Sequence, residues 1–212
     1  MNEPDFSTGL EPHRALFLEW GFTEDQIARL VAYLGRLWAA NQSMNLFSRK
    51  LSPQSLMVDH LLDCLIALPF FPNTQSAADL GSGGGFPGIP LAIARPGCQF
   101  NLFEKSPKKR QFLASISDLA PNTTVYGLIG PDSIPTETGW VTARAFKPIP
   151  VILELTRNYA KAGGRYLLYK GRHQVIESEL KAAKCRPNQV TRHRLNPIGT
   201  AEERYLVEIK SR

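Results

Sequence analysis

Cysteine and histidine are both scarce in this sequence. The chain of 212 residues holds only three cysteines, Cys64, Cys98 and Cys185, and no two have CxxC spacing. An odd, scattered set argues against a disulfide framework or a zinc site, and it suits a reducing compartment. No group of histidines, cysteines and acidic residues in the sequence suggests a set of metal ligands. We therefore expect no metal site.

Long apolar runs are missing as well. The longest, near Leu61 to Phe71, is interrupted by Asp63 and Pro69, and it is shorter than the roughly 20 apolar residues that span a bilayer. The acidic residues at the N-terminus have no apolar stretch behind them, which argues against a signal peptide. These absences predict a cytoplasmic protein that has no membrane partner.

Positive charge is sparse until the last third of the chain. Residues 1–143 hold 10 Lys+Arg against 13 Asp+Glu, whereas residues 144–212 hold 15 against 6. A basic C-terminal third attracts a polyanion such as RNA. An ordinary solvated basic face explains the same excess equally well, so charge alone does not identify the partner.

From residue 76 onward, apolar strands alternate with helices. Seven strands are expected, near 76–80, 98–104, 123–128, 139–143, 164–169, 189–194 and 204–210. Four helices are expected between them, near 87–95, 107–119, 148–161 and 173–184. Such alternation predicts a mostly parallel α/β sheet. The loop around Asn196-Pro197-Ile198-Gly199 has no crossover helix, so one of the last two strands should run antiparallel.

The first 72 residues predict helices only. Thr23 and Gln26 have the spacing of a capping box, and apolar residues follow at helical intervals. Ser52-Pro53 opens a second helix, which should run to about Leu68. We therefore predict a helical cap over residues 1–72 and a sheet domain over residues 73–212, within one compact unit.

The most informative stretch follows the first strand. Four glycines fall within the five positions 81–85, and they let the backbone turn tightly and approach a ligand closely. Asp79 precedes them. Glu104 ends the next strand, 25 residues after Asp79, where an acid can accept both hydroxyls of a ribose. This arrangement predicts a nucleoside-binding loop.

A dinucleotide oxidoreductase uses similar geometry and is the main competitor. In this chain, however, the position three after Gly83 is Phe86 rather than glycine. Asp79 is also a poor neighbour for a pyrophosphate and a good one for the amino group of a methionine moiety. The loop therefore favours S-adenosylmethionine over a dinucleotide.

The longer string of residues narrows this interpretation. The segment Asp79-Leu80-Gly81-Ser82-Gly83-Gly84-Gly85-Phe86-Pro87-Gly88-Ile89-Pro90-Leu91 resembles motif I of the class I methyltransferases. More narrowly, it resembles the bacterial guanine-N7 methyltransferase G family of small-subunit ribosomal RNA, also called glucose-inhibited division protein B. Further segments that resemble the family are Asn41 with Asn45-Leu46, His60-Leu61-Leu62-Asp63, Lys109-Arg110 with Phe112-Leu113, Ala143-Arg144-Ala145-Phe146, Lys170-Gly171 and Glu202 with Arg204.

This resemblance implies a fold, a donor and an acceptor. The fold is a Rossmann-like, seven-stranded sheet with one antiparallel strand, the donor is S-adenosyl-L-methionine, and the acceptor is N7 of a guanine in small-subunit (16S) ribosomal RNA. The residues expected to bind the donor are Asp79, Gly81, Ser82, Gly83, Phe86, Glu104, Ile129, Gly130 and Arg144. Those expected to bind the acceptor are Asn45, His60, Arg144, Lys170 and Arg172, with Arg144 and Asn45 organising catalysis. We expect a monomer.

The chain departs from the family pattern at a few positions. Ala40, Asp59, Cys64 and Gly130 stand where the family usually has Trp, Arg, Ser and an acidic residue. Asp132 is the carboxylate nearest to the missing acid at Gly130. These departures affect the expected adenine contact and one RNA contact, and they leave the glycine loop intact.

The residues present suit methylation of guanine N7 better than other base methylations. The N7 lone pair is free in neutral guanine, so alignment with the donor supplies most of the acceleration and no general base is needed. A pyrimidine-C5 enzyme needs a cysteine nucleophile, and Cys98 lies away from the ligand edge. An exocyclic-amine enzyme usually has an Asn/Asp-Pro-Pro-aromatic loop, where this chain has Ala143–Pro148. Phe146 suits either base stacking or core packing.

Two alternatives stay open at this point. One is a methyltransferase of another acceptor, and the other is a donor-binding ribosome assembly factor without catalysis. The basic cluster Lys105, Lys108, Lys109 and Arg110 is equally compatible with an RNA footprint and with a solvated face.

Overall fold

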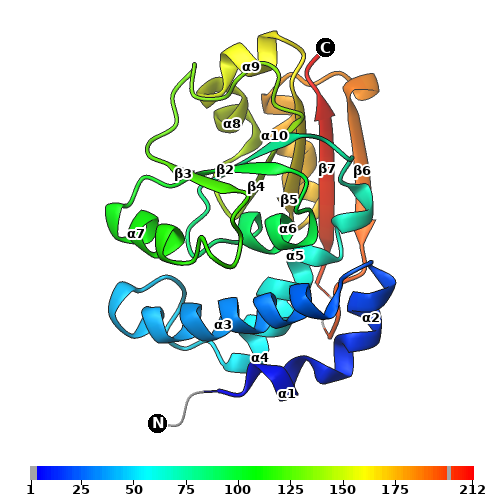
Figure 1. Ribbon diagram of the computed structural model, residues 1–212. Coiled ribbons are helices and arrows are strands. Elements are labelled where there is room, and N and C mark those ends of the chain that lie inside the picture. The colour runs from blue at the N-terminus through cyan, green and yellow to red at the C-terminus, as the bar shows by residue number, and fades with distance from the viewer. Residues whose placement is uncertain (1–3, 200–201) are drawn as a thin grey trace.

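Seven strands form one sheet, in the order β3-β2-β1-β4-β5-β7-β6, in the computed structural model, which describes residues 4–199 and 202–212 (Figure 1). The strands are β1 (Ser76–Leu80), β2 (Gln99–Phe103), β3 (Thr123–Tyr126), β4 (Trp140–Arg144), β5 (Arg165–Lys170), β6 (Val190–Leu195) and β7 (Arg204–Lys210). Only β7 runs antiparallel to its neighbours. The predicted mostly parallel sheet with one antiparallel strand is confirmed.

The reversed direction of β7 matters for the site. The described residues between β6 and β7, 196–199 and 202–203, contain no helix, and such a short link cannot make the crossover that a parallel pair requires. In the resulting antiparallel register, Lys170 at the end of β5 lies beside Tyr205 at the start of β7. The first residue of β7, Arg204, therefore lies at the carboxyl edge of the parallel strands, where ligands bind in open α/β sheets.

Helices cover both faces of the sheet. The helices that follow the first strand are α6 (Gly88–Ala94), α7 (Pro107–Ser115), α8 (Ile149–Leu155), α9 (Arg157–Lys161), α10 (His173–Ala182) and the short η4 (Pro187–Gln189). Side chains of α8, α9 and α10 pack in one core cluster, and those of α6 and α7 pack in the other, together with the N-terminal helices. This is the three-layer arrangement expected for alternating strands and helices.

The single helix predicted over residues 148–161 is wrong, because the chain breaks into α8 and α9 at Thr156. The Thr156 hydroxyl is fully buried, donates to the Ile152 carbonyl at 2.8 Å and bonds the Tyr166 hydroxyl at 2.8 Å. A hydroxyl that bonds the preceding turn competes with regular helix geometry.

The N-terminal cap consists of helices and contains an unusual turn. Its elements are α1 (Phe6–Leu10), η1 (Glu11–His13), α2 (Arg14–Glu19), α3 (Glu24–Met44), α4 (Pro53–Ser55), the π-helix η2 (Leu56–Leu62), α5 (Asp63–Leu65) and η3 (Leu68–Phe70). The capping box at Thr23 is confirmed by reciprocal bonds with Gln26. The helix predicted to open at Ser52-Pro53 is confirmed, with Ser52 as its N-cap, but its middle is a π-helix, a form often found at functional sites.

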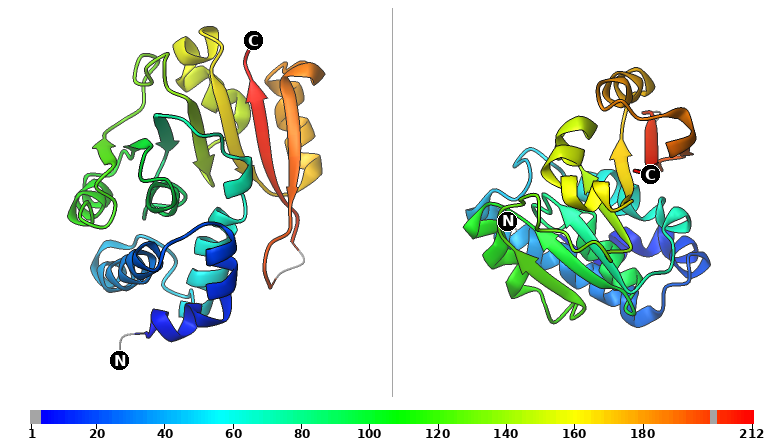
Figure 2. Two further views of the ribbon diagram at one scale, coloured as in Figure 1. Left: turned by 45° about the vertical axis from the view of Figure 1, so that its right-hand side comes forward. Right: turned by 90° about the horizontal axis from the view of Figure 1, so that it is seen from above.

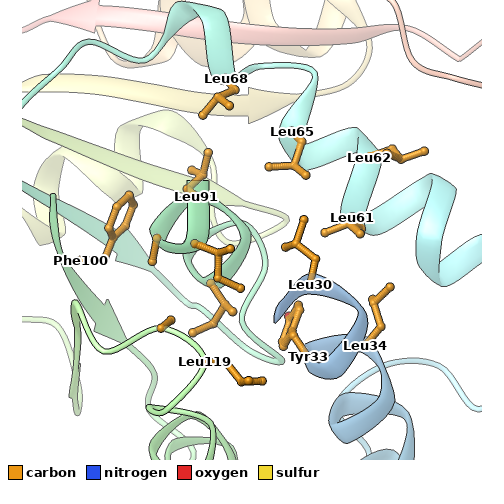
Figure 3. Packing of buried hydrophobic residues seen from close by; sticks show 14 of the residues in the cluster. Leu30, Tyr33, Leu34, Leu61, Leu62, Leu65, Leu68, Leu91, Phe100 and Leu119 are labelled. Carbon is orange, nitrogen blue, oxygen red and sulfur yellow. The ribbon is translucent and has the colours of Figure 1, made fainter. Parts of the chain in front are cut away.

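The cap packs against the sheet domain rather than standing apart. Leu30, Tyr33 and Leu34 of α3 share one buried cluster with Leu91 of α6 and Phe100 of β2 (Figure 3). The cap lies below the carboxyl edge of the parallel strands (Figure 2). The domain boundary at residue 72 stays a prediction. Within the described residues, no helix is long and apolar enough to cross a bilayer.

Candidate functional site

The glycine loop is fastened to the ends of two strands. The backbone N–H groups of Gly81 and Ser82 donate to the Phe103 carbonyl at 2.8 and 3.1 Å. The Glu104 carboxylate accepts from the N–H of Gly83 at 3.0 Å and from the N–H of Ser106 at 2.8 Å. Glu104 therefore joins the loop after β1 to the start of α7 and holds the loop open at the carboxyl edge.

A cavity of about 480 Å³ lies beside this loop. Its lining combines the carboxylate of Glu104 with apolar surface and three lysines; the lining residues are Gly81, Phe103, Glu104, Lys105, Lys109, Gly127, Leu128, Ile129, Ala145, Phe146, Lys147 and Leu155. An acid at the tip of the second strand, next to an apolar slot, suits a nucleoside with its ribose on the acid. Three predicted donor residues, Gly81, Glu104 and Ile129, meet in this cavity.

Asp79 lies beneath the loop and lines neither this cavity nor the second one described below. Its carboxylate is fully buried, and Oδ2 accepts from the Gly88 N–H at 3.2 Å, while Oδ1 has no hydrogen-bond partner. Burial raises the pKa of Asp79 to about 7. The charged form is therefore costly, since desolvation is the largest cause of the shift.

Ionisation of Asp79 should make stability fall as pH rises. The folded pKa is about 7 and the reference pKa is 3.8, so between these values the folded state holds a proton that the unfolded state has lost. The Asp79→Asn variant should gain about 3 kcal/mol of unfolding free energy relative to the wild type between pH 5 and pH 8. Urea unfolding at a series of pH values measures the difference in unfolding free energy between the variant and the wild type. A difference that does not change with pH contradicts a raised pKa for Asp79.

The cap supports the glycine loop from below through Tyr33 of α3. The Tyr33 hydroxyl is fully buried and donates to the Gly84 carbonyl at 2.8 Å. A Cβ at Gly85 would lie 2.8 Å from the same hydroxyl oxygen, and Gly85 has a φ of +111°. Only glycine fits there, so the loop and the cap helix are shaped to each other.

Removing this hydroxyl should weaken donor binding. In the Tyr33→Phe variant the Gly84 carbonyl loses its partner, and a hydrogen bond of this kind contributes about 1 kcal/mol. We expect the dissociation constant for S-adenosylhomocysteine to rise about fivefold in calorimetric titration. Tyr205→Phe, on β7, is the matched control and should leave the constant unchanged. Equal constants for Tyr33→Phe and the wild type would show that the cap does not shape the loop.

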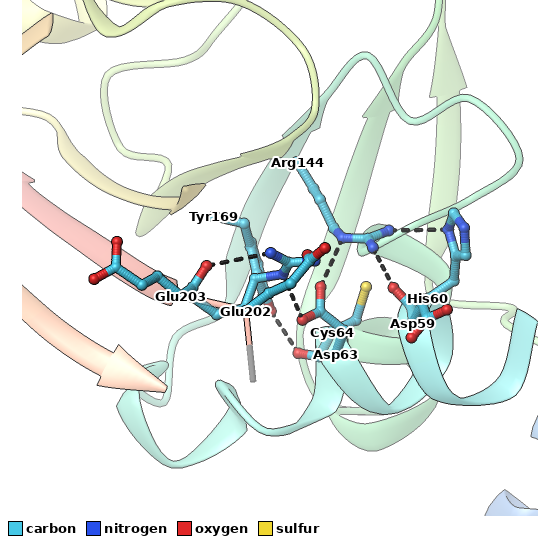
Figure 4. Close-up of polar contacts among 9 residues, drawn as sticks. Asp59, His60, Asp63, Cys64, Arg144, Tyr169, Glu202 and Glu203 are labelled. Carbon is cyan, nitrogen blue, oxygen red and sulfur yellow. Dashed lines mark hydrogen bonds and ion pairs between the residues drawn. The ribbon is translucent and has the colours of Figure 1, made fainter. Parts of the chain in front are cut away.

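Arg144, at the end of β4, binds the π-helix of the cap (Figure 4). Its Nε donates to Asp63 Oδ2 at 3.1 Å, Nη2 donates to the Asp59 carbonyl at 2.5 Å, and Nη1 lies 3.2 Å from His60 Nδ1. Asp63 is buried, and its Oδ1 accepts from Arg204 Nε at 3.2 Å. The π-helix thus brings a carbonyl and an imidazole, and the start of α5 brings a carboxylate, onto one guanidinium.

Three titratable groups near Arg144, namely His60, Cys64 and Tyr169, are held in their uncharged forms. Burial, together with the Arg144 charge, lowers the pKa of His60 to about 4. Burial raises the pKa of Cys64 to about 12 and that of Tyr169 well above 10. At neutral pH none of these groups is a proton donor or acceptor of ordinary strength, so the site is built to position a ligand rather than to move protons.

A second cavity, of about 440 Å³, opens beside Arg144. Its lining is rich in cations and aromatic or apolar surface; the lining residues are His60, Asp63, Ala143, Arg144, Ala145, Phe146, Lys147, Pro148, Ile152, Tyr169, Lys170, Gly171, Glu179 and Arg204. The segment 145–147 belongs to both cavities. The two cavities are therefore adjacent compartments with one shared wall.

Phe146 forms the centre of that wall. A Cβ on Gly81 would lie 2.3 Å from Phe146 Cδ2, so the ring rests directly on the first glycine of the loop. Ala145, just before it, has a φ of +51°, a left-handed conformation that a non-glycine residue adopts at a cost. The strained turn after β4 thus determines the position of the Phe146 ring between the two cavities.

Other predicted site residues lie elsewhere in the structure. Asn45 is exposed and ends α3 in a left-handed conformation, and Arg172 is exposed at the start of α10; neither lines a cavity. Phe86 packs near Tyr33 and His60, with ring centroids 5.4 and 5.5 Å away. Lys170 lines the second cavity and is paired with Glu179 at 2.7 Å. Their roles in binding stay predictions.

Three residues near the donor cavity, Ser82, Gly130 and Asp132, form hydrogen bonds with other residues of the chain. Ser82 is buried and donates to the Asp79 carbonyl at 3.2 Å. The Gly130 N–H donates to Ser133 Oγ at 2.7 Å. Asp132 accepts from Asn158 and does not line the cavity, and its substitution for the missing acid stays a prediction.

Three features of the site could not be predicted from the sequence. These are the hydroxyl of Tyr33 under the loop, the pairing of Arg204 with Arg144 through Asp63, and the shared wall at Phe146. Tyr33 sits among apolar residues at helical spacing, and Arg204 lies far from Arg144 in sequence. Only the antiparallel placement of β7 brings the two arginines together.

Comparison with known proteins identifies the family. The model of the family described as rRNA small subunit methyltransferase G matches residues 26–207. The chain belongs to this family. A relative from Bdellovibrio bacteriovorus, named Ribosomal RNA small subunit methyltransferase G 1, is 43% identical over 206 residues, which cover 96% of this chain and 100% of the relative. A relative from Coxiella burnetii, Ribosomal RNA small subunit methyltransferase G, is 34% identical over 185 residues, covering 86% of this chain and 87% of the relative.

The family resemblance predicted from the residue strings is thus confirmed, and the protein is an S-adenosylmethionine-dependent ribosomal RNA methyltransferase. Solved structures share its fold at low identity. A putative O-methyltransferase from Klebsiella pneumoniae superposes with a TM-score of 0.57 at 14% identity, covering 84% of this chain and 89% of that chain. A precorrin-6y C5,15-methyltransferase from Geobacter metallireducens gives a TM-score of 0.53 at 14% identity, covering 77% and 92%.

Proposed function

We propose that the protein transfers the methyl group of S-adenosylmethionine to N7 of a guanine in the RNA of the small ribosomal subunit. The observation that carries this proposal is the pair of cavities on either side of the segment 145–147, in a member of the rRNA small subunit methyltransferase G family. One cavity has the acid and the apolar slot that suit a nucleoside donor. The other has the cations and aromatic surface that suit a nucleotide acceptor.

The donor is assigned to the cavity beside the glycine loop. Glu104, already aligned by the N–H groups of Gly83 and Ser106, is the acceptor for the ribose hydroxyls. Leu128, Ile129 and Leu155 supply apolar surface for the adenine ring. The first glycine then places the methionine end of the donor next to Phe146 and the second cavity.

The chemistry requires alignment and no proton transfer. The N7 lone pair forms a bond to the methyl carbon as the carbon–sulfur bond breaks, and the positive charge passes from sulfur to the base. Neutral His60, Cys64 and Tyr169 agree with such a site, because none of them is poised to act as a base. Holding the two reacting atoms close and in line supplies most of the rate.

The acceptor is assigned as RNA because lysines rim both cavities. Lys105 and Lys109 line the donor cavity, Lys147 lines both cavities, and Lys170 lines the second. Lysines at a rim neutralise phosphates and position a polynucleotide without reading its sequence. The monomeric state and the cytoplasmic location remain predictions.

Salt should weaken capture of the acceptor and leave the donor almost unaffected. If three rim lysines neutralise phosphates, log affinity falls by roughly 0.7 to 0.9 per phosphate for each decade of salt. We expect KM for small subunits to rise about tenfold between 100 and 300 mM KCl, while KM for S-adenosylmethionine changes less than twofold. A KM for the acceptor that is insensitive to salt would favour a small neutral acceptor instead.

The experiment that tests the proposed function uses purified protein, methyl-labelled S-adenosylmethionine and small ribosomal subunits from a strain lacking this gene. The RNA is digested to nucleosides and separated. The expected result is a labelled peak of 7-methylguanosine. Label on a different nucleoside would overturn the N7-guanine assignment, and donor binding without any label would favour an assembly factor.

A further inference from the structure

The chemistry of the second cavity distinguishes guanine from adenine at one atom. Guanine presents two acceptors, N7 and O6, on its major-groove edge, whereas adenine presents N7 and an amino group that donates. O6 is next to N7, so a protein group that reads position 6 lies close to the methyl group during transfer. A fixed N–H donor at that place accepts guanine and opposes adenine.

His60 lies where such a donor is needed. It lines the second cavity, and its ring centroid is 5.5 Å from that of Phe86, which belongs to the glycine loop of the donor side. It is partly buried on the π-helix, next to Arg144 at the end of β4. The imidazole therefore lines the second cavity next to the residue that follows the glycine loop.

Arg144 fixes which nitrogen of His60 holds the hydrogen. Arg144 Nη1 lies 3.2 Å from His60 Nδ1, and a guanidinium only donates, so Nδ1 must accept. The hydrogen of the neutral ring is then on Nε2, which is a donor in this tautomer. Arg144 is held by Asp63 and by the Asp59 carbonyl, so its orientation is fixed as well.

The uncharged state of His60 suits the reaction. Methyl transfer places a positive charge on the base, and a nearby imidazolium would oppose that charge. Burial and the Arg144 charge both lower the pKa of His60, so the ring donates a hydrogen bond as a neutral group at physiological pH.

We propose that the cavity lined by His60, Arg144 and Tyr169 binds the acceptor base, and that the Nε2–H of His60 donates to guanine O6 and selects guanine. This inference rests on the proposed function and adds to it a base pocket and a specificity residue. Arg144 is a positioning residue in this scheme, because it acts on the base through the tautomer of His60.

The test uses small-subunit RNA in which the target guanine is replaced by a single analogue through ligation, followed by assembly into subunits. 2-Aminopurine lacks O6 and keeps N7, whereas hypoxanthine keeps both and lacks the 2-amino group. With the wild-type enzyme we expect methylation of hypoxanthine at nearly the guanine rate and of 2-aminopurine about 30-fold more slowly, which corresponds to one good base contact.

His60 variants show whether that loss passes through this side chain. His60→Phe should be about 30-fold slower on guanine, with no further loss on 2-aminopurine, because the two changes remove the same contact. His60→Gln retains an N–H donor and should recover most of the rate. Thermal unfolding of both variants shows that they are folded.

The outcomes separate the two proposals. Absence of 7-methylguanosine from guanine-bearing subunits would overturn the proposed function and this inference together. Methylation of guanine and 2-aminopurine at equal rates by the wild type would overturn the role of His60 alone, without using any variant. Losses that multiply between His60→Phe and 2-aminopurine would likewise show that His60 does not contact O6.

Discussion

Replacing Glu104 with alanine is expected to weaken S-adenosylmethionine binding by about 100-fold or more. The carboxylate is buried and accepts hydrogen bonds from the N–H groups of Gly83 and Ser106. Hydrogen bonds to a charged group each contribute about 1.5–3 kcal/mol. The variant loses the ribose acceptor and the fastening of the glycine loop at once. Calorimetric titration with S-adenosylhomocysteine measures the effect directly.

Glu104→Gln is the matched control for shape. Its amide retains one acceptor oxygen and replaces the other with a donor, which opposes one of the two backbone N–H groups. We expect the affinity for S-adenosylhomocysteine to fall about tenfold, which is between the values for the wild type and for Glu104→Ala. If Glu104→Ala binds the donor as tightly as the wild type, the nucleoside is not in the cavity beside the glycine loop.

The second large effect is expected on stability, from Asp63→Asn. Asp63 lies between two guanidinium groups, at 3.1 Å from Arg144 Nε and 3.2 Å from Arg204 Nε, with its side chain only 5% exposed. Removing the charge leaves both arginines without their shared counter-ion, and breaking a buried ion pair from one side costs about 3–5 kcal/mol. For a chain of this size we expect the melting temperature to fall by about 10 °C.

Asp118→Asn provides the comparison at the surface. Asp118 also pairs with an arginine, Arg36, at 2.6 Å, but its side chain is 57% exposed. Exposed pairs contribute little, so its melting temperature should stay close to that of the wild type. Equal shifts for the two variants would mean that Asp63 does not hold the cap to the end of β4.

Much of the architecture was predictable because it depends on local pattern. The strand positions, the reversed strand and the capping box of α3 follow from periodicity, loop length and cap chemistry, and the structure confirms them. The break at Thr156 and the π-helix at Leu56–Leu62 were not predictable in this way. Both arise where side chains bond partners that are distant or buried, which periodicity does not reveal.

The site likewise has one part that was predictable from the sequence and one part that was not. The glycine loop and Glu104 come from neighbouring strand ends, so sequence order alone predicts that they meet. The contacts of Arg144 with His60 and Asp63, and of Arg204 with the same Asp63, join the cap, β4 and β7. These contacts depend on tertiary packing, and they show that Arg144 holds the π-helix in place, while its role in ligand binding stays a prediction.

The most direct measurement is to map the methylated atom in cells. A strain lacking the gene receives either the wild-type gene or the Glu104→Ala variant, and its small-subunit RNA is treated with borohydride and aniline, which cleave at 7-methylguanosine. We predict cleavage at one guanine with the wild-type gene and none with the variant. Uncleaved RNA from cells that express the folded wild-type protein would contradict the assignment of this enzyme to guanine N7.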